Sequence, residues 1–354
     1  MLYIISLEPL ETRYTAQWQR WFKEEFPESI EIAGDTLSEL QNNKNFLNPF
    51  HTNIWKSEQI IKISNLFREN KINSGDKFLF LDAWHYGVIA LRYMASLSDI
   101  DIKIYGLWHA GSYDDYDLLG LKGLFSCFGS FEKSLFGCLD KSFVATQFHE
   151  NLIFSKFKED IYDISITGSP YKFGEIVVTG FPYRFEELDK YGGIRKKENI
   201  VIFPHRLSEE KQPEILKDLE KDLEAHNIKC IFCQETKLSK DEYHKLLAKS
   251  KICFSASLQE TWGLGTFEAL YLDCIPVIPR RLSYTEMYNN CYLYPDCYTN
   301  HANQHNRHHR DALLSTILEK ISYYNYYLSF RDDNINFLKE NYCTFKNIRR
   351  EMGE

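Results

Sequence analysis

The sequence predicts an α/β protein with two doubly wound domains, each built around a parallel β-sheet. Short apolar runs that are typical of buried strands alternate with longer amphipathic runs that are typical of helices. This alternation occurs as two series, separated by a polar stretch with a glycine pair at residues 182–199. A length of 354 residues also suits two domains.

The first series opens with an apolar strand at residues 2–6 and an amphipathic helix at residues 13–26, which carries an aromatic stripe. A second helix is predicted at residues 57–70, and a third at residues 87–97. The remaining strands of this series are predicted at residues 77–83, 102–108, 142–146 and 175–180.

The second series has helices at residues 213–226 and 241–250. Its apolar strands are predicted at residues 199–204, 229–234, 251–257 and 274–279. We expect a first domain over residues 1–185 and a second over residues 186–330, with a C-terminal helix at about residues 331–354 packing back on the first. Ligands of such sheets bind beyond the carboxyl ends of the strands, so we expect a cleft between the domains.

Composition limits the class of protein. Hydrophobic residues make up 44% and charged residues 26%, which is ordinary for a soluble globular protein. The net charge of −8 argues against an open, non-specific nucleic-acid binder. Nine scattered cysteines favour a reduced, cytoplasmic compartment. We expect no signal peptide in the short N-terminal apolar run and no membrane span, because no apolar run approaches about 20 residues.

Charged side chains follow two strands of the second series. Arg206 and Lys211 lie just past the strand at residues 199–204, and a guanidinium with a nearby ammonium suits a diphosphate. The segment "SLQETWGLGTFEAL" gives a glycine-containing turn and a helix start, whose N–H groups favour an anion. Glu260 and Glu268 at that start can accept hydrogen bonds from sugar hydroxyls. Together these features predict a nucleotide-sugar ligand.

This half of the sequence resembles the retaining glycosyltransferases of the two-domain GT-B fold. "FPHRLSEEK" is similar to their Gly-Arg-Leu-x-x-x-Lys segment, and "SLQETWGLGTFEALYLDCIPVI" to their Glu-x7-Glu signature. "VVTGFP" resembles the segment that ends their first domain. The resemblance covers about residues 175–290, and the first half only by topology. Two departures are a histidine, His205, where glycine is usual, and the absence of a Gly-Gly pair after "PVI".

The resemblance implies roles for these residues. Arg206 and Lys211 would neutralise the diphosphate of a UDP-sugar donor, Glu260 would contact the transferred sugar, and Glu268 would hold the ribose hydroxyls. The backbone amides that would bind the donor phosphates belong to Gly263, Leu264 and Gly265. His109, which follows a first-half strand, matches a histidine that contacts the donor sugar in this family.

The mechanism that the resemblance implies is attack by the acceptor hydroxyl on the face from which the diphosphate leaves. The departing phosphate oxygen would take the proton, so no protein nucleophile and no essential metal or other cofactor is expected. Asp114, Asp115 and Asp117, which follow His109, could suggest a metal-binding carboxylate pair. A metal is not needed for the diphosphate, however, because Arg206 and Lys211 already match it. Cys230 and Cys233 point to opposite faces of a strand, and the histidine-rich segment at residues 301–310 has no helix or strand pattern.

The acceptor is predicted from a second resemblance. "ETRYTAQW" and "GLWHAGSYD" resemble segments of phage enzymes that add glucose or arabinose to hydroxymethylated cytosine in DNA. That resemblance implies double-stranded DNA as partner, a base flipped into the cleft and a location in the host cytoplasm. The acceptor-side candidates are Glu11, Arg13, Tyr14, Asp115, Arg280 and Arg281.

Two alternatives stay open at this point. One is a transferase that acts on a polysaccharide, a lipopolysaccharide or a small glycoside. The other is a non-catalytic module that binds a nucleotide sugar, in which Glu260 would be dispensable. The diphosphate and ribose contacts are common to hexose and pentose donors, so the sequence predicts no particular sugar.

Overall fold

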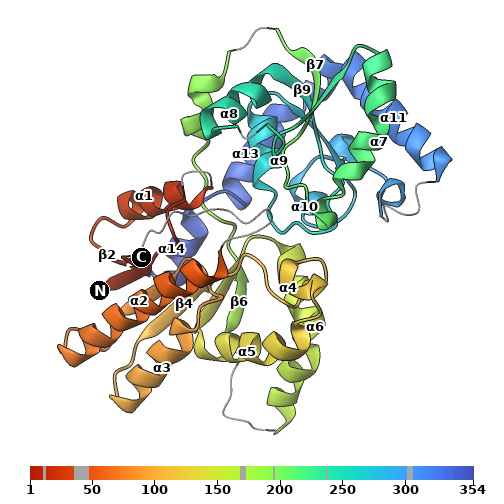
Figure 1. The fold of residues 1–354 in the computed structure, drawn as a ribbon. Helices are drawn as coiled ribbons and strands as arrows, with labels where there is room; N and C mark the ends of the chain where they lie inside the picture. Colours follow the sequence, from red (N-terminus) through yellow and green to blue (C-terminus); the bar gives the residue numbers. More distant parts are fainter. Residues whose placement is uncertain (11–12, 36–47, 168–172, 194–195, 237, 301–305) are drawn as a thin grey trace. The chain divides into compact units, whose positions relative to one another are not determined.

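Two parallel sheets, one in each half of the chain, organise the fold (Figure 1). The computed structural model describes residues 1–354 apart from 11–12, 36–47, 168–172, 194–195, 237 and 301–305. The chain divides into unit 1, Met1–Phe181 with Phe345–Glu354, and unit 2, Pro182–Thr344. The division between Phe181 and Pro182 lies at the start of the polar stretch at residues 182–199, four residues before the predicted limit at residue 185.

Unit 1 contains a six-stranded sheet in the order β2-β1-β3-β4-β5-β6, in which every neighbouring pair is parallel. The strands are β1 Leu2–Ile5, β2 Ile30–Ile32, β3 Lys77–Phe80, β4 Lys103–Leu107, β5 Lys141–Val144 and β6 Glu175–Val178. The helices are α1 Thr15–Glu25, α2 Pro49–Arg68, α3 Gly87–Leu97, α4 Leu118–Leu121, α5 Phe125–Cys138, α6 Gln147–Thr167 and α14 Lys346–Met352.

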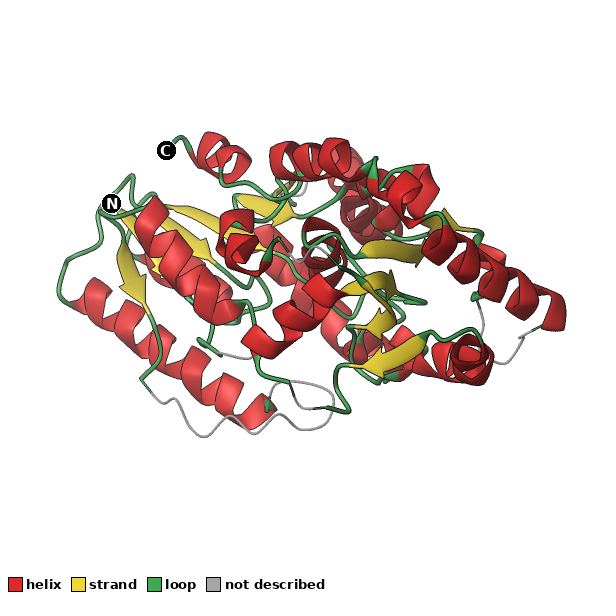
Figure 2. Ribbon diagram, turned by 90° about the horizontal axis from the view of Figure 1, so that it is seen from above, coloured by secondary structure: helices red, strands yellow, loops and turns green. Residues whose placement is uncertain are grey.

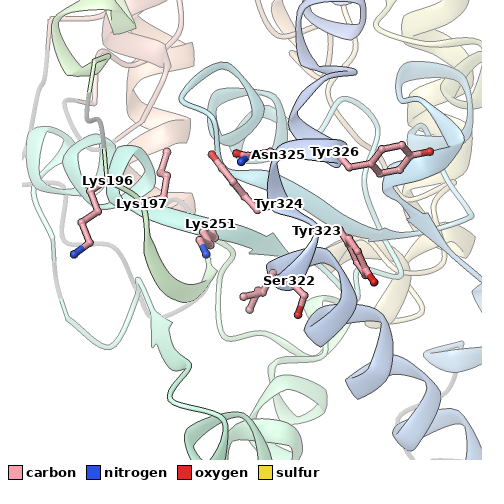
Figure 3. Close-up of a pocket in the computed structure, with 9 residues that line it drawn as sticks. Lys196, Lys197, Lys251, Ser322, Tyr323, Tyr324, Asn325 and Tyr326 are labelled. Carbon is pink, nitrogen blue, oxygen red and sulfur yellow. The ribbon is translucent and has the colours of Figure 1, made fainter.

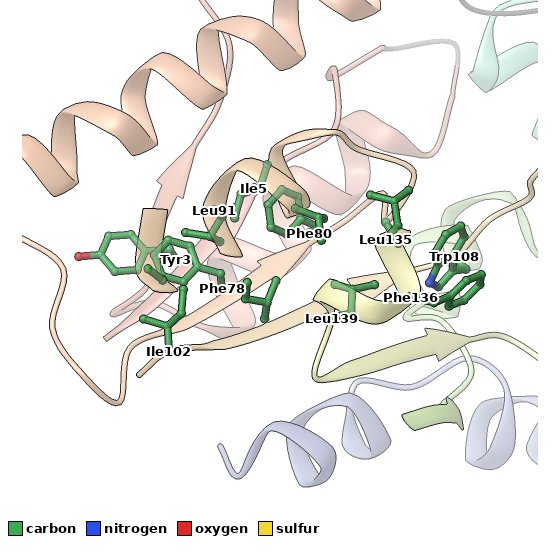
Figure 4. Close-up of a cluster of buried hydrophobic side chains, with 14 of the residues drawn as sticks. Tyr3, Ile5, Phe78, Phe80, Leu91, Ile102, Trp108, Leu135, Phe136 and Leu139 are labelled. Carbon is green, nitrogen blue, oxygen red and sulfur yellow. The ribbon is translucent and has the colours of Figure 1, made fainter. Parts of the chain in front are cut away.

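Alternate strand residues build two apolar layers in unit 1, as the period of a β-strand requires. Phe78 and Phe80 of β3 join a buried cluster with Leu91 of α3 and Phe136 of α5 (Figure 4). Leu79, between the two phenylalanines, is also fully buried but lies outside that cluster. Both faces of the sheet are therefore covered, which is why these strands are continuous apolar runs.

The C-terminal residues return to unit 1. Lys141 of β5 forms a 2.8 Å ion pair with Glu351, and Asn347 donates to the backbone oxygen of Thr179 at 3.1 Å. The predicted helix at about residues 331–354 is in fact two helices, α13 in unit 2 and α14 in unit 1. The chain leaves the helical path after Tyr342, whose backbone oxygen accepts from the Trp262 indole at 2.9 Å.

Unit 2 contains a five-stranded parallel sheet in the order β11-β10-β9-β7-β8. Figure 2 shows helices on either side of the strands in each unit. The strands are β7 Glu198–Phe203, β8 Lys229–Phe232, β9 Ser250–Phe254, β10 Ile275–Pro279 and β11 Leu293–Tyr294. The helices are α7 Pro213–Ala225, α8 Lys240–Lys249, α9 Leu264–Tyr271, α10 Tyr284–Met287, α11 Arg307–Ser322, α12 Tyr324–Leu328 and α13 Arg331–Asn341. The 3₁₀ turns are η1 Phe185–Tyr191, η2 Glu209–Lys211, η3 Asn290–Tyr292 and η4 Asp296–Tyr298.

The order of the strands marks one switch point in each sheet. In unit 2 the chain passes from β7 to β8 on one side and then to β9 on the other. In unit 1 it passes from β1 to β2 and then to β3 in the same way. At such a point the two connections diverge and leave a crevice beyond the carboxyl ends of the strands, where open α/β sheets bind ligands. The functional site of unit 2 is therefore expected after β7 and β9.

Within the part of the chain that the structure describes, no helix is both long enough and apolar enough to cross a membrane.

Phe136 tests how tightly the core of unit 1 is packed. Its ring is fully buried and stacks on Trp108 with centroids 4.0 Å apart and on Phe173 at 5.0 Å. Phe136→Ala should lower the free energy of unfolding by about 3–5 kcal/mol, because it leaves a cavity among rings. Urea unfolding measures the change. Phe50→Ala, at a side chain that is 74% exposed, is the control and should stay within about 0.5 kcal/mol of wild type.

Candidate functional site

The switch point of unit 2 brings together the charged residues that the sequence singles out. β7 and β9 are neighbours in the sheet, and both end at the same edge (Figure 1). The loop after β7 carries Arg206 and leads to η2, which ends at Lys211. The loop after β9 carries Glu260 and leads into α9. These three side chains come from segments about 50 residues apart in the sequence, and the parallel pairing of the two strands is what makes them neighbours.

Lys211 joins the two loops. Its ammonium donates to the backbone oxygen of Gln259, lies 3.3 Å from the side-chain oxygen of the same residue, and lies 3.4 Å from Glu260 Oε2. The Lys211 side chain is only 6% exposed. A cation removed from water needs such a shell of acceptors, since an unpaired buried charge is strongly destabilising. The ammonium is therefore fixed beside the Glu260 carboxylate.

Glu260 is held from its other side by backbone amides. Its Oε1 accepts from the N–H of Gly263 at 2.9 Å and, less closely, from that of Trp262 at 3.4 Å. Burial alone would raise the pKa of the Glu260 carboxyl, but the charge of Lys211 and these amides outweigh burial and lower that pKa. Glu260 is therefore a fixed anion whose two oxygens have different partners.

Gly263 allows this arrangement. It precedes the first residue of α9 with φ of +76°, in the left-handed region that residues with a Cβ rarely adopt. A Cβ at this position would lie 3.1 Å from the ring of Tyr284. The glycine therefore directs its N–H toward Glu260, and α9 begins at the next residue.

The amino end of α9 adds backbone N–H groups to the site. The first N–H groups of a helix have no carbonyl partner in a preceding turn, and Leu264 and Gly265 occupy these positions. A Cβ at Gly265 would come within 3.3 Å of the Tyr243 hydroxyl and 3.5 Å of Pro204. The absence of a side chain at Gly265 therefore avoids close contacts between the first turn of α9 and these two neighbours.

Arg206 is the most accessible cation of the site. Its guanidinium forms a 2.8 Å ion pair with Glu210, and its side chain is 31% exposed. Glu210 also accepts from the Ser208 hydroxyl at 2.6 Å and is 6% exposed. The site therefore contains two cation–carboxylate pairs, one at Arg206 and one at Lys211.

Glu268 lies further along α9 and is almost fully buried, with 1% of its surface exposed. Its Oε1 accepts from the Tyr183 hydroxyl at 2.7 Å and lies 3.3 Å from Nε2 of His244 on α8. Helical side chains lean toward the amino end of their helix, and Glu268 follows Gly265 by three positions, so both residues lie on one face. The carboxylate therefore lies on the same face of α9 as Gly265.

His205 departs from the glycine that is usual before the arginine. The imidazole is buried, and burial together with the cations Lys211 and Arg206 lowers its pKa to about 3. Within the described part of the chain, its buried Nε2 atom has no hydrogen-bond partner. The residue is therefore a neutral, polar group on which the charges of Lys211, Glu260 and Arg206 act.

In unit 1, the structure brings His109 and Tyr14 together. His109 follows β4, its Nε2 lies 2.7 Å from the backbone oxygen of Leu81, and its Nδ1 lies 3.1 Å from the Tyr14 hydroxyl. A carbonyl only accepts, so Nε2 carries the hydrogen and Nδ1 accepts from Tyr14. Burial lowers the pKa of His109, which keeps the ring neutral. Its contact with a donor sugar stays a prediction.

The other acceptor-side candidates have different surroundings. Asp115 is exposed and forms a 2.7 Å ion pair with Lys156. Arg13 is partly exposed and adds its positive charge to the surroundings of His109, whereas Glu11 lies outside the described residues. None of these observations tests an acceptor role.

Arg280 and Arg281 differ although they are adjacent. Arg280 is exposed and donates to Asn290 at 2.9 Å. Arg281 is 13% exposed, pairs with Asp296 at 2.8 Å and donates to the backbone oxygens of Ser257 and Ala256. The guanidinium of Arg281 therefore has a structural role, because it holds the loop after β9.

A separate pocket lies at the opposite edge of the same sheet (Figure 3). Lys197 comes just before β7 and Lys251 lies at the start of β9, so this pocket is at the amino ends of the strands. None of the predicted donor-binding residues lines it. The residues that line it are Lys196, Lys197, Lys251, Ile321, Ser322, Tyr323, Tyr324, Asn325 and Tyr326.

The described residues contain no group of three or more histidine, cysteine or acidic side chains arranged to hold a metal ion. Cys230 and Cys233 are buried, and burial raises the pKa of each thiol to about 12. His301 and His305 lie outside the described residues.

Comparison with solved structures identifies the fold. A UDP-forming α,α-trehalose-phosphate synthase from Burkholderia vietnamiensis superposes with a TM-score of 0.60 and 9% identity, over 97% of this chain and 96% of that one. The sucrose-phosphate synthase of Thermosynechococcus elongatus gives 0.59 and 12%, over 99% and 97%. S. aureus TarM, solved with UDP, gives 0.53 and 14%, over 84% and 58%. No protein-family model matches the sequence.

The chain has the GT-B fold. Trehalose-phosphate synthase and sucrose-phosphate synthase match it over nearly their whole length, whereas the chain spans 58% of TarM and 59% of the pneumococcal O-GlcNAc transferase GtfA. At identities of 9–14% the likeness concerns the fold alone. The two parallel sheets of the GT-B chain are the ones predicted from the alternation of strands and helices.

Several residues of the site are missed by sequence reasoning. Tyr183 and His244 bind Glu268, and Gln259 binds Lys211, but none of the three is singled out by a motif. Tyr183 follows "VVTGFP" directly, so its place at the start of unit 2 was the available signal. His244 lies on the buried side of an amphipathic helix, where a histidine gives no sign of its partner.

His205 should make the protein sensitive to mild acid. In the unfolded chain the pKa of His205 is about 6.5, whereas in the folded protein it is lowered to about 3. Between these values the unfolded chain binds a proton that the folded protein does not. The folded state therefore loses stability as pH falls below about 6.5. Between pH 7.5 and 5.5, His205→Gln should lose about 1.4 kcal/mol less stability than wild type, as measured by urea unfolding.

His226→Gln, at an exposed histidine of the same unit, is the matched control for this measurement and should follow the wild-type pH dependence. An identical pH dependence in wild type and His205→Gln would show that the buried imidazole is protonated in the folded protein.

Proposed function

We propose that the protein is a retaining glycosyltransferase that moves a sugar from a UDP-sugar to an acceptor hydroxyl. The observation that carries this proposal is the convergence of Lys211, Glu260 and the amino end of α9 at the switch point of unit 2. GT-B chains with known complexes support the choice of donor, because TarM and GtfA were both solved with UDP.

The geometry suits departure of a diphosphate. The α9 amides of Leu264 and Gly265 would receive phosphate oxygens, and Lys211 would supply a fixed positive charge nearby. Arg206 has solvent access and would reach the diphosphate by exchanging Glu210 for phosphate oxygens. These groups would stabilise the leaving group, whose oxygen then takes the proton of the attacking hydroxyl.

Glu260 would contact the sugar that is transferred. Its Oε1 is bound by the Gly263 amide, and its Oε2 is near Lys211, so the carboxylate is oriented before any ligand arrives. This preorganisation is what catalysis by positioning requires. Because Arg206, Lys211 and the helix amides already provide the positive charge, we propose that the reaction needs no essential metal.

For the acceptor we propose 5-hydroxymethylcytosine in duplex DNA, with glucose or arabinose as the sugar. The proposal is supported by the resemblance of "ETRYTAQW" and "GLWHAGSYD" to phage enzymes of this type. In unit 1, Tyr14 from the first segment is hydrogen-bonded to His109 from the second. The two segments that carry the resemblance therefore contribute to one cluster.

A saccharide acceptor is the second candidate, and the net charge of −8 favours it, since duplex DNA is bound mainly through its phosphates. Among the matched structures, TarM was solved with α-GlcNAc-glycerol and GtfA with GlcNAc. A polysaccharide, lipopolysaccharide or small glycoside would need no positive surface.

Removing the charges of the site should stop transfer while the fold persists. Lys211→Ala and Glu260→Gln should each lower kcat/KM by at least about 100-fold, as loss of one preorganised electrostatic group does. Lys217→Ala is the matched control, because this lysine is exposed on α7 and pairs with Glu235. Full activity of Glu260→Gln would refute the assignment. A wild-type protein that binds the sugar nucleotide but shows no turnover would favour a binding module.

The acceptor is tested by a donor panel on duplex DNA. UDP-glucose and a pentose nucleotide donor are incubated with hydroxymethylated, methylated and unmodified DNA, and the nucleosides are analysed by mass spectrometry. We expect a mass gain of one sugar on hydroxymethylcytosine alone. If the donor is consumed, no nucleoside gains mass and sugar is transferred to members of a glycan panel, the proposed DNA acceptor is wrong and the saccharide acceptor takes its place.

A further inference from the structure

The partners of Glu268 are unevenly distributed between its two oxygens. The Tyr183 hydroxyl at 2.7 Å and the His244 Nε2 at 3.3 Å both approach Oε1. All three residues are buried, with exposed fractions of 5% or less. A buried carboxylate normally needs hydrogen-bond donors at both oxygens, since it has about four lone-pair sites that accept. Within the residues that the structure describes, Oε2 is therefore the oxygen with capacity for a ligand.

Tyr183 is held firmly in this position. Its ring packs edge-to-face on Phe267 of α9 at 4.9 Å and on Phe185 at 5.0 Å. Burial, followed by the nearby Glu268, raises the pKa of the Tyr183 hydroxyl well above its ordinary value of 10.0. The hydroxyl therefore keeps its proton at any physiological pH and acts as a permanent donor to Oε1.

His244 approaches from a different element. It lies on α8, which packs beside α9, and its ring contacts Tyr191 of η1 with centroids 5.0 Å apart. An ionised carboxylate only accepts hydrogen bonds, so the Nε2 atom of His244 must carry a hydrogen in this contact. The Glu268 side chain is thus held at once by Tyr183, which precedes η1, and by His244 of α8. These two contacts leave it little rotational freedom.

We propose that Tyr183 and His244 are positioning residues that hold Oε1 of Glu268 so that the carboxylate reads the ribose hydroxyls of the donor nucleotide. This inference rests on the proposed function and on the ribose-binding role that the family resemblance implies for Glu268. A carboxylate with one oxygen fixed presents its second oxygen in one orientation, which selects for a 2′-hydroxyl. The clamp formed by these two residues thereby makes the site specific for ribonucleotides over deoxyribonucleotides.

The direct test compares the binding of UDP and of 2′-deoxy-UDP by isothermal titration calorimetry. The two probes differ by one hydroxyl, so their affinity ratio reports on ribose reading and is insensitive to general weakening of the site. Wild type should bind UDP at least about tenfold more tightly than 2′-deoxy-UDP, because a site built to bond a hydroxyl rejects the analogue that lacks it.

Tyr183→Phe removes only the hydroxyl and keeps the ring packing. The UDP preference should fall to about threefold or less, with binding of 2′-deoxy-UDP nearly unchanged, because the lost group held only the ribose-reading carboxylate. His244→Leu should have the same effect, whereas His244→Gln, which keeps an N–H at similar reach, should retain most of the preference.

Tyr292→Phe is the matched control. Tyr292 is also a fully buried tyrosine of unit 2, but its hydroxyl donates to the backbone oxygen of Tyr327 at 3.1 Å. It should keep the wild-type UDP preference even if the fold is slightly less stable.

The outcomes separate the two proposals. A wild-type preference for UDP that survives in Tyr183→Phe and His244→Leu would overturn the clamp and leave the proposed function intact. Equal binding of the two nucleotides by wild type would overturn the clamp and the ribose role of Glu268. Failure of wild type to bind any of UDP, GDP or ADP would instead overturn the proposed function, and the clamp with it.

Discussion

The site depends on one buried cation. The Lys211 ammonium is nearly inaccessible to water, so it must be surrounded by acceptors, and these come from a loop that follows a different strand. Two further hydrogen bonds strengthen the same junction. The Leu258 backbone N–H donates to the backbone oxygen of Glu210 at 2.7 Å, and the side-chain amide of Gln212 donates to the backbone oxygen of Ala256. The loops after β7 and β9 therefore behave as one structure, and the position of Glu260 follows from the position of Lys211.

The balance of charge in this structure limits how an anion can enter. Arg206 with Glu210 and Lys211 with Glu260 form two pairs, so the four side chains carry no net charge. A diphosphate must find its stabilisation in the amides of α9 and in the release of one pair. Lys211 is buried and held by Gln259 as well as Glu260, whereas Arg206 is about a third exposed. Arg206 is therefore the cation that can exchange its partner at the lowest cost.

The sequence predicted the two sheets and singled out the charged residues that the structure brings together after β7 and β9, because both follow from local patterns. Apolar runs with strand length identify β7 and β9, and parallel strands place their following loops at one edge. The predictions stopped where tertiary contacts decide. β2 is three residues long with one buried side chain, and α5 carries a weak pattern among many aromatic residues, so neither gave a period to recognise. Tyr183 and Glu268 meet across 85 positions, a pairing that no spacing rule gives.

Arg281 and His205 show why residue type alone does not predict which side chains of the site bind a ligand. Arg281 follows β10 beside the site, as a phosphate ligand would, but it binds the carbonyls of Ala256 and Ser257 and so supports the loop that carries Glu260. His205 replaces a glycine and brings a buried Nε2 atom that has no partner within the described residues. Leaving such an atom unsatisfied costs about 1–3 kcal/mol. Proteins tend to break such local rules at functional sites, and the imidazole of His205 is close enough to Lys211, Glu260 and Arg206 for the charge of each to act on it.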